Sequence, residues 1–264
     1  MIEHMLNPVL FDLPGGLQIR YYGLMYLVGL AIGYFIIKKL VQERGIKLNQ
    51  EEVLDYIIYL GIGLLVGGRI FYFIFYMPWV FWQNPLEVLM LWHGGMSFHG
   101  GLIGAFVAAH IFCRKKKVSF YHMADITVIP AALALALGRI GNFINGELPG
   151  RIWNGSLCIN YENNPYLQNP PEGCRYPSQI VESIKNLVIF SSLWLLKDKN
   201  LVRGSLFWLF VLFYGILRFL VEFIRQPDPQ LGFFLGWMTM GQILSVFMIV
   251  IGGFMVYKRN SQSL

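Results

Sequence analysis

Seven long apolar runs dominate the sequence and most constrain how the chain can fold. They cover residues 21–37, 53–76, 97–113, 123–144, 178–196, 204–224 and 235–257. A helix that crosses a bilayer needs about 20 mostly apolar residues, and lipid forces the backbone to satisfy its own hydrogen bonds. We therefore predict an all-α integral membrane protein with about seven transmembrane helices, which form a single polytopic domain over residues 1–264.

Basic residues set the expected orientation. Lys and Arg cluster after the first, third, fifth and seventh runs, whereas residues 77–95, after the second run, contain neither. Because basic loops stay on the cytoplasmic side, we expect the N-terminus outside and the C-terminus in the cytoplasm. Residues 1–20 have no basic head, so they do not resemble a cleaved signal peptide. The net charge of +6 is divided among short loops, which argues against a nucleic-acid partner and for the lipid bilayer.

The longest connection, residues 147–177, lies between the fourth and fifth runs and is rich in Asn, Pro and Gly. We predict a loop-rich extracytoplasmic cap; a floppy connection is the alternative. Cys158 and Cys174 both lie in it, and an oxidising compartment would allow them to form a disulfide, although two free thiols are the alternative. The sequence has no ligand spacing for a structural metal, and no cofactor is expected.

Polar residues recur near the outer ends of five runs, where charge in a membrane is costly and usually functional. They are Tyr21, Tyr22, Arg69, His99, Arg139, Arg218 and Glu222. Their shared depth predicts a cavity open to the outer leaflet. As alternatives, Arg69 and Arg225 could extend to lipid head groups, and an Arg218–Glu222 pair could only link helices.

Two polar stripes and one glycine-rich stretch are candidate sites. Helical spacing predicts one face with Arg139, Asn142 and Gly146, and another with Tyr214, Arg218, Glu222 and Arg225. The stretch from Trp92 to Gly104 includes Gly100 and Gly101, whose backbone amides could approach an anion. His99 in this stretch titrates near neutrality and could accept a proton, or could be an ordinary packed polar residue.

Four motifs together resemble the prolipoprotein diacylglyceryl transferase family. They are residues 138–147 (GRIGNFINGE) with Gly150, residues 95–104 (GMSFHGGLIG), residues 22–26 (YGLMY) and residues 218–228 (RFLVEFIRQPD). The resemblance implies transfer of an sn-1,2-diacylglyceryl group from phosphatidylglycerol to the lipobox cysteine of a prolipoprotein, which releases glycerol 1-phosphate. It also implies the bacterial inner membrane, with the active site toward the outer leaflet. The resemblance is weaker over residues 151–175, and Pro149 lies at a position that we do not expect to be fixed in the family.

The resemblance also implies site residues. Arg139 would contact phosphatidylglycerol, and Arg218 would be a second cation on the phosphate. Positions that the family uses for activity match His99, Tyr22, Asn142, Glu147, Gly150, Tyr214 and Glu222.

The residue chemistry agrees with such a transfer. We hypothesise His99 as the base for the thiol, with Glu147 as the other candidate. Arg139 and Arg218 would stabilise the leaving phosphate, and Asn142 would orient phosphate or glycerol. The rival classes are a phospholipid or anion transporter, which usually has midplane sites and repeats, and a structural or receptor-like seven-helix protein.

Overall fold

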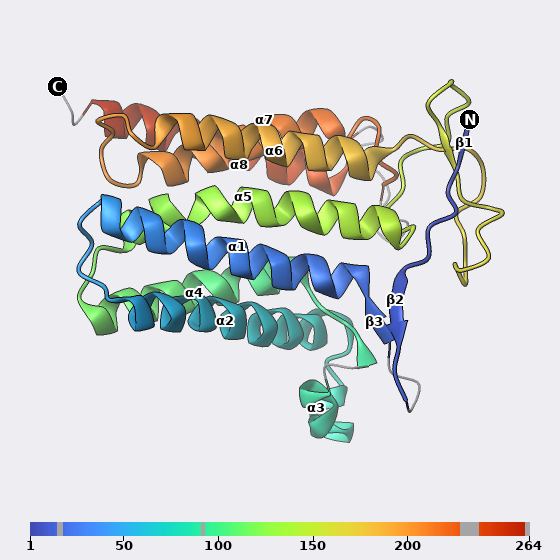
Figure 1. Ribbon diagram of the computed structural model, residues 1–264, viewed down its shortest axis with the longest axis horizontal. Coiled ribbons are helices and arrows are strands. Elements are labelled where there is room, and N and C mark those ends of the chain that lie inside the picture. Colours follow the sequence, from blue (N-terminus) through green and yellow to red (C-terminus); the bar gives the residue numbers. More distant parts are fainter. Residues whose placement is uncertain (15–17, 91–92, 228–237, 262–264) are drawn as a thin grey trace. The chain divides into compact units, whose positions relative to one another are not determined.

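The computed structural model describes residues 1–14, 18–90, 93–227 and 238–261 (Figure 1). The long helices are α1 (Tyr21–Glu43), α2 (Gln50–Tyr76), α4 (Phe98–Lys116), α5 (Phe120–Ile144), α6 (Ser178–Leu196), α7 (Ser205–Val221) and α8 (Met240–Asn260). The short elements are β1 (Ile2–Glu3), β2 (Val9–Asp12), β3 (Gln18–Arg20), β4 (Ile159–Asn160), α3 (Val80–Gln83) and the 3-10 helix η1 (Pro85–Leu89). Trp92, Asp228 and residues 235–237 of the seventh run lie outside the described residues.

Each predicted apolar run corresponds to one long helix, which confirms an all-α integral membrane protein. Within the described ranges, α1, α2, α5, α6 and α8 are long and apolar enough to cross a membrane, and α7 is a shorter apolar helix. Helix α4 ends in a basic turn of Arg114, Lys115 and Lys116. The chain is therefore a multi-pass membrane protein, while its orientation and the crossing by α4 and α7 stay predictions.

The chain forms two compact units. The first unit contains residues 1–33 and 125–264, and the second contains residues 34–124. The prediction of one polytopic domain stays a prediction, and each unit is described by itself.

In the second unit, glycines allow α2 and α4 to pack with their backbones close together. A Cβ added at Gly104 would lie 2.0 Å from the Gly63 carbonyl oxygen, and one at Gly100 would lie 2.4 Å from the Gly67 carbonyl oxygen. Small residues are typical of such close helix contacts in membranes. Gly100 therefore has a packing role in this unit.

Arg69 fixes the segment between α2 and α4. Its side chain is only 3% exposed. The guanidinium donates hydrogen bonds to the backbone carbonyls of Glu87, Val88, Met90, Gly94 and Gly95. The alternative that Arg69 extends to lipid head groups is therefore wrong, because its donors are used to order this connection.

In the first unit, α6, α7 and α8 run side by side (Figure 1). Asp125 of α5 accepts hydrogen bonds from the backbone N–H groups of Gly204, at 2.6 Å, and Phe207, at 2.8 Å. A carboxylate at a helix N-terminus satisfies donors that the helix cannot. Asp125 thereby joins the first turn of α7 to α5.

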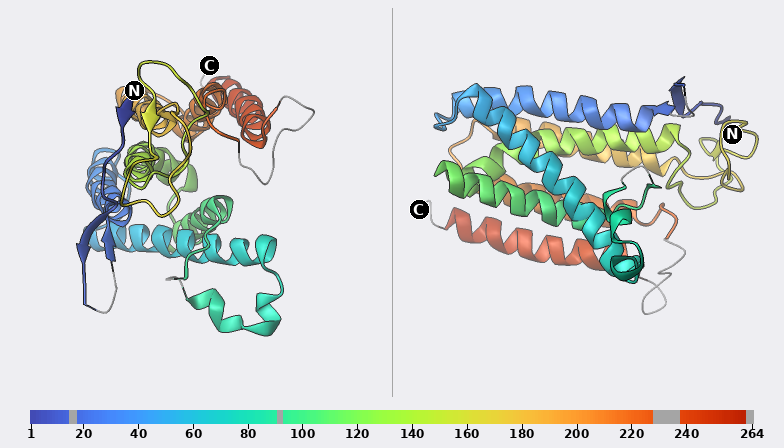
Figure 2. Two further views of the ribbon diagram at one scale, coloured as in Figure 1. Left: turned by 90° about the vertical axis from the view of Figure 1, so that its right-hand side faces the viewer. Right: turned by 90° about the horizontal axis from the view of Figure 1, so that it is seen from below.

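The N-terminal segment and residues 147–177 pack together, with β1 parallel to β4 (Figure 2). Cys158 and Cys174 form a disulfide, which decides between the two alternatives for these thiols. His4 is buried, and its Nε2 lies 2.8 Å from the Phe143 carbonyl oxygen, while its Nδ1 lies 2.8 Å from the Asn164 side-chain nitrogen. Burial lowers the pKa of His4, so the neutral ring accepts from the amide and donates to the carbonyl. These contacts give the segment a defined fold, and its side of the membrane stays a prediction.

Candidate active site

The end of α5 brings Arg139, Asn142 and Glu147 together. Arg139 Nη1 lies 3.4 Å from Asn142 Oδ1, and Asn142 Nδ2 donates to Glu147 Oε2 at 3.0 Å. The prediction that Gly146 shares the helix face is wrong, because α5 ends at Ile144 and Gly146 has a φ of +68°. A glycine in this conformation ends a helix. The resulting turn carries Glu147 back to Asn142, whose carbonyl accepts the Glu147 N–H at 2.9 Å.

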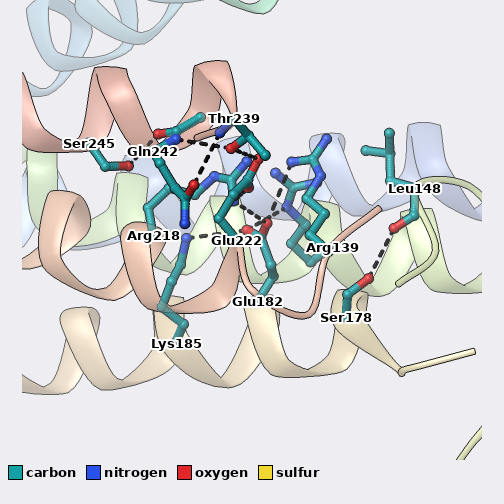
Figure 3. Close-up of polar contacts among 12 residues, drawn as sticks. Arg139, Leu148, Ser178, Glu182, Lys185, Arg218, Glu222, Thr239, Gln242 and Ser245 are labelled. Atoms are coloured by element: carbon teal, nitrogen blue, oxygen red, sulfur yellow. Dashed lines mark hydrogen bonds and ion pairs between the residues drawn. The ribbon is translucent and has the colours of Figure 1, made fainter. Parts of the chain in front are cut away.

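Glu182 of α6 is the centre of the site, and the sequence interpretation missed it. Its side chain is 2% exposed. Its Oε2 lies 3.2 Å from Arg139 Nε and 3.2 Å from Lys185 Nζ, while its Oε1 lies 3.7 Å from Arg218 Nη1 and 3.6 Å from Arg225 Nη1 (Figure 3). One buried carboxylate therefore gathers four cationic side chains.

Glu222 is the second anion of the cluster. Arg218 of α7 donates a short hydrogen bond to Glu222 Oε2, and Thr239 Oγ1 donates to Glu222 Oε1 at 2.8 Å. Thr239 also caps α8 by a reciprocal pair of bonds with Gln242. The carboxylate thus joins the end of α7 to the start of α8, and the predicted Arg218–Glu222 contact is confirmed.

Arg225 reaches Glu182 from outside α7, which ends at Val221. Its backbone forms an antiparallel bridge with Gly150. A Cβ at Gly150 would lie 2.5 Å from the Tyr176 carbonyl oxygen and 2.9 Å from the Ile224 carbonyl oxygen. Gly150 is therefore required for close backbone packing beside the cluster, and its part in lipid binding stays a prediction.

Two aromatic residues border this arrangement. The ring of Tyr214 lies under Lys185, whose Nζ is 4.1 Å from the ring centroid. Tyr22 packs on α5, because a Cβ at Gly141 would lie 2.9 Å from its ring. The hydroxyl of Tyr22 lies 2.9 Å from that of Tyr26. Both predicted tyrosines therefore belong to the first unit.

The two units divide the predicted residues. The first unit contains Tyr22, Arg139, Asn142, Glu147, Gly150, Tyr214, Arg218 and Glu222, and the second contains His99, Gly100 and Gly101. His99 is exposed, and its ring makes an edge contact with Phe98. The amides of Gly100 and Gly101 donate to the side chain and the carbonyl of Ser97, the N-cap of α4. The proposed roles of His99 and both glycines stay predictions.

The charge balance of the cluster favours an anionic ligand. Among the described residues, the side chains in ionic contact with Glu182 or Glu222 are Arg139, Lys185, Arg218 and Arg225. Among the described residues, four cationic side chains thus contact two carboxylates. Planar guanidinium donors match pairs of phosphate oxygens and remain charged in a dry site. In the described part of the chain, no group of three or more His, Cys, Asp or Glu could hold a metal ion.

The sequence did contain a signal for the missed residues. Glu182 and Lys185 are opposite charges three positions apart within the apolar run 178–196. Ionisable residues inside a membrane segment are functional candidates by default. The fifth run, like the fourth and sixth, therefore contains candidate functional residues.

Comparison with known proteins identifies relatives over nearly the whole chain. The family model described as prolipoprotein diacylglyceryl transferase matches residues 8–258. A protein from Geobacter sulfurreducens is 42% identical over 248 residues, which are 94% of this chain and 93% of the relative. Proteins from Rickettsia africae and Rickettsia conorii are 39% and 40% identical, each over 97% of both chains. All three carry the name phosphatidylglycerol–prolipoprotein diacylglyceryl transferase.

Proposed function

The chain belongs to the prolipoprotein diacylglyceryl transferase family, and we propose from this premise how its own residues perform the transfer. It is a membrane transferase of lipoprotein biosynthesis, and its reaction is the first step of lipoprotein maturation. Phosphatidylglycerol is the lipid donor. The acceptor is the thiol of the lipobox cysteine in a prolipoprotein signal peptide.

The proposed reaction is a displacement at the glyceryl carbon that bears the phosphate. The thiol sulfur forms a bond to this carbon while the carbon–oxygen bond to phosphate breaks. The thiol proton passes to a base, the diacylglyceryl group remains on sulfur as a thioether, and glycerol 1-phosphate leaves. The phosphate changes from a diester to a monoester, so negative charge grows on its oxygens as the bond breaks.

The observation that carries this proposal is the convergence of Arg139 and Arg218 on Glu182. Preorganised cations stabilise charge that develops in a transition state without rearranging at that moment. The Glu182 carboxylate holds both guanidinium groups in place, since it makes ionic contacts with side chains from three helices (Figure 3). In this proposal Arg139 and Arg218 bind the phosphate, and Asn142 orients phosphate or glycerol from its position between Arg139 and Glu147.

The base is proposed to be His99, with Glu147 as the other candidate. A thiol reacts as its thiolate, so a proton acceptor beside the substrate cysteine accelerates attack. Glu147 is exposed and borders the arginines through Asn142. His99 is exposed as well, in the first turn of α4.

The site is proposed to open toward the outer leaflet of the bacterial cytoplasmic membrane. The Cys158–Cys174 disulfide supports this orientation, because disulfides persist in oxidising compartments and are rare in the cytosol. The basic loops support it as well, since they would then lie on the cytoplasmic side. Secreted precursors would then reach the site from the outer leaflet of this membrane.

The test is an in vitro transfer assay with the detergent-purified protein. Labelled phosphatidylglycerol is incubated with a peptide that contains a lipobox cysteine, and the thioether product is followed by mass. A peptide with serine in place of cysteine is the control. A lipid transporter would bind or move lipid without forming the thioether, so absence of product with an otherwise intact protein would refute the transferase proposal.

Two variants distinguish the candidate bases. His99→Gln should abolish most turnover if His99 accepts the thiol proton, whereas His110→Gln, an exposed histidine on the same helix α4, should not. Near-normal turnover of His99→Gln would exclude that role. Loss of turnover in Glu147→Gln with retained lipid binding would then favour Glu147.

A further inference from the structure

A groove between α6 and α7 has no part in the mechanism described above. Its volume is about 160 Å³. It is lined by Val188, Ile189 and Ser192 of α6 and by Phe213, Ile216 and Leu217 of α7. Ile189 is buried, whereas Val188 and Ile216 are exposed, so the groove is open on one side. Because α6 is long and apolar enough to cross a membrane, this open side faces lipid in a bilayer.

The lining favours an apolar occupant. Ser192 is the one polar side chain among the six lining residues, and its hydroxyl donates to the Val188 carbonyl oxygen at 2.8 Å. A bound water needs about two to four polar partners. The groove offers a water molecule only this hydroxyl, which already donates within its own helix, so a hydrocarbon fits better than water or a polar head group.

The size of the groove restricts the occupant further. An apolar cavity of about 150 Å³ stays dry and accepts benzene, so this groove can hold on the order of six carbon atoms. A helix is about 10 Å wide with its side chains, which is too wide to enter. A single alkyl chain is therefore the occupant that the volume and the lining select.

The groove is continuous with the ion cluster around Glu182. Leu217 of the groove directly precedes Arg218, which contacts Glu182. Ile189 follows Lys185 by four residues and so lies on the same face of α6, one turn further along the helix. The groove therefore begins where the ionic side chains of these two helices end.

The order of cluster and groove along the helices matches the order of groups in a phospholipid. At about 1.5 Å per residue, Val188 lies about 9 Å beyond Glu182 along α6, and Phe213 lies about 8 Å before Arg218 along α7. Both displacements lead away from the helix ends that carry the cluster, toward the middle of α6 and α7. In a phospholipid, the acyl chains likewise run from the phosphate toward the middle of the bilayer, within a leaflet about 15 Å deep.

We propose that this groove binds one acyl chain of the phosphatidylglycerol substrate while the phosphate lies against Arg218. The inference rests on the proposed function for the identity of the lipid, and on the lining, volume and position of the groove for the chain. Lipid tails are as apolar as the groove, so moving a chain into it from the bilayer gives little hydrophobic gain. The gain is in orientation, because the reacting glyceryl carbon is then held from both sides, by the phosphate and by the chain.

Photo-crosslinking tests the occupant, with the full chain in detergent and no peptide present. The probe is phosphatidylglycerol with a diazirine about six carbons along one acyl chain, and adducts are located by mass spectrometry. We expect adducts on the groove residues of α6 and α7, and loss of most of this yield in Ser192→Phe, whose ring would fill the groove. The matched control is Ser191→Phe, which adds the same ring at an exposed position outside the lining and should keep the yield.

Three results would overturn the proposal. An equal yield from phosphatidylcholine with the same photoreactive chain would show a lipid without head-group selection. Adducts spread evenly over exposed residues of α1 and α8 would show ordinary contact with lipid, and an unchanged yield in Ser192→Phe would place the chain elsewhere. If Ser192→Phe does not fold, Ile216→Trp fills the groove from α7 and takes its place.

Turnover tests the orienting role of the groove. The assay compares kcat/KM for dipalmitoyl phosphatidylglycerol with kcat/KM for the dibutanoyl lipid, whose chains are too short to fill the groove. The ratio of the two should fall at least about tenfold in Ser192→Phe, because a chain outside the groove leaves the reacting carbon misplaced. Ser191→Phe should leave the ratio unchanged. An equal loss with both lipids would show a distorted ion cluster and overturn the orienting role.

The two proposals fail separately. Absence of thioether with every lipid would refute the transfer reaction, and it would leave the crosslinking result unaffected because that experiment contains no peptide. Normal thioether formation without adducts in the groove would refute the acyl-chain site and leave the transfer reaction standing.

Discussion

Substituting Glu182 by Gln should be among the most destabilising single changes at the site. The carboxylate lies within 3.7 Å of four cationic side chains, and its own side chain is 2% exposed. Glutamine has nearly the same shape, so the change removes charge without leaving a cavity. Arg139, Lys185 and Arg225 would then lose the carboxylate that each of them contacts among the described residues.

The magnitude follows from the burial of this ion cluster. Removing one partner of a buried ion pair costs about 3–5 kcal/mol, because the remaining charge is left without compensation. Water cannot compensate the charges of the four cations in place of the Glu182 carboxylate, since this position is almost inaccessible to solvent. We therefore expect Glu182→Gln to lower the free energy of unfolding by about 3–5 kcal/mol.

Denaturant titration in detergent measures this loss, and a double variant tests its cause. Glu182→Gln combined with Lys185→Met removes one charge of each sign from a contacting pair. The double variant should therefore be more stable than the sum of the single losses predicts, by about 0.5–3 kcal/mol. The matched control is Glu43→Gln in the exposed Lys39–Glu43 pair, where N and O are 3.7 Å apart. A surface pair of this kind contributes about 0–1 kcal/mol.

Two results would refute the reasoning. The first is unfolding of Glu182→Gln at the same denaturant concentration as the unmodified chain, which would mean that the four cations do not depend on the carboxylate. The second is a double variant whose loss of stability equals the sum of the two single losses, with no coupling between them. Glu182 and Lys185 would then act independently in spite of their contact.

Three further predictions concern packing, pH and the disulfide. Gly104→Ala should destabilise the protein by about 1–3 kcal/mol, because its Cβ would lie 2.0 Å from a backbone oxygen of α2. The control Gly61→Ala, whose Cβ would have nothing within 4 Å, should not destabilise it, and thermal unfolding of both variants measures the difference. Burial lowers the pKa of His4 from 6.5, so the unfolded state binds more protons, and the His4 contribution to stability should be full above pH 6.5 and fall as the pH drops below it. Unfolding measured at several pH values should lose this pH dependence in His4→Gln. The same pH profile in both proteins would contradict the lowered pKa of His4. Replacing both Cys158 and Cys174 by Ser should cost about 3 kcal/mol and abolish the mobility shift that reduction causes on a gel, and no shift in the unmodified chain would show free thiols.

The helices could be predicted well because membrane helices are specified locally. The fifth run, residues 178–196, has the bounds of α6, and the fourth ends at Ile144 as α5 does. Sequence reasoning missed the four short strands and the end of the Arg139 face. The strands are too short for a pattern, and a single glycine, Gly146, reversed the direction of the chain beyond α5.

The site was predicted in part. Arg139, Asn142, Arg218 and Glu222 were identified, and the structure brings Arg139 and Arg218 to one carboxylate. That carboxylate, Glu182, was missed because the fifth run was read only as a span. Arg69 was placed among the polar residues of the site, whereas its donors are used by the connection between α2 and α4.

By itself, the sequence determined that the chain lies in a lipid bilayer, where its helices lie and which buried charges are costly. It could do so because apolar length, basic loops and ionisable residues are properties of single segments. It could not determine which charges compensate one another. Arg139, Glu182, Lys185 and Arg218 come from three helices, and pairing at 3–4 Å depends on how those helices rotate and pack. Only the tertiary structure decides this, because the free energy of a buried ion depends on its immediate neighbours rather than on its position along the chain.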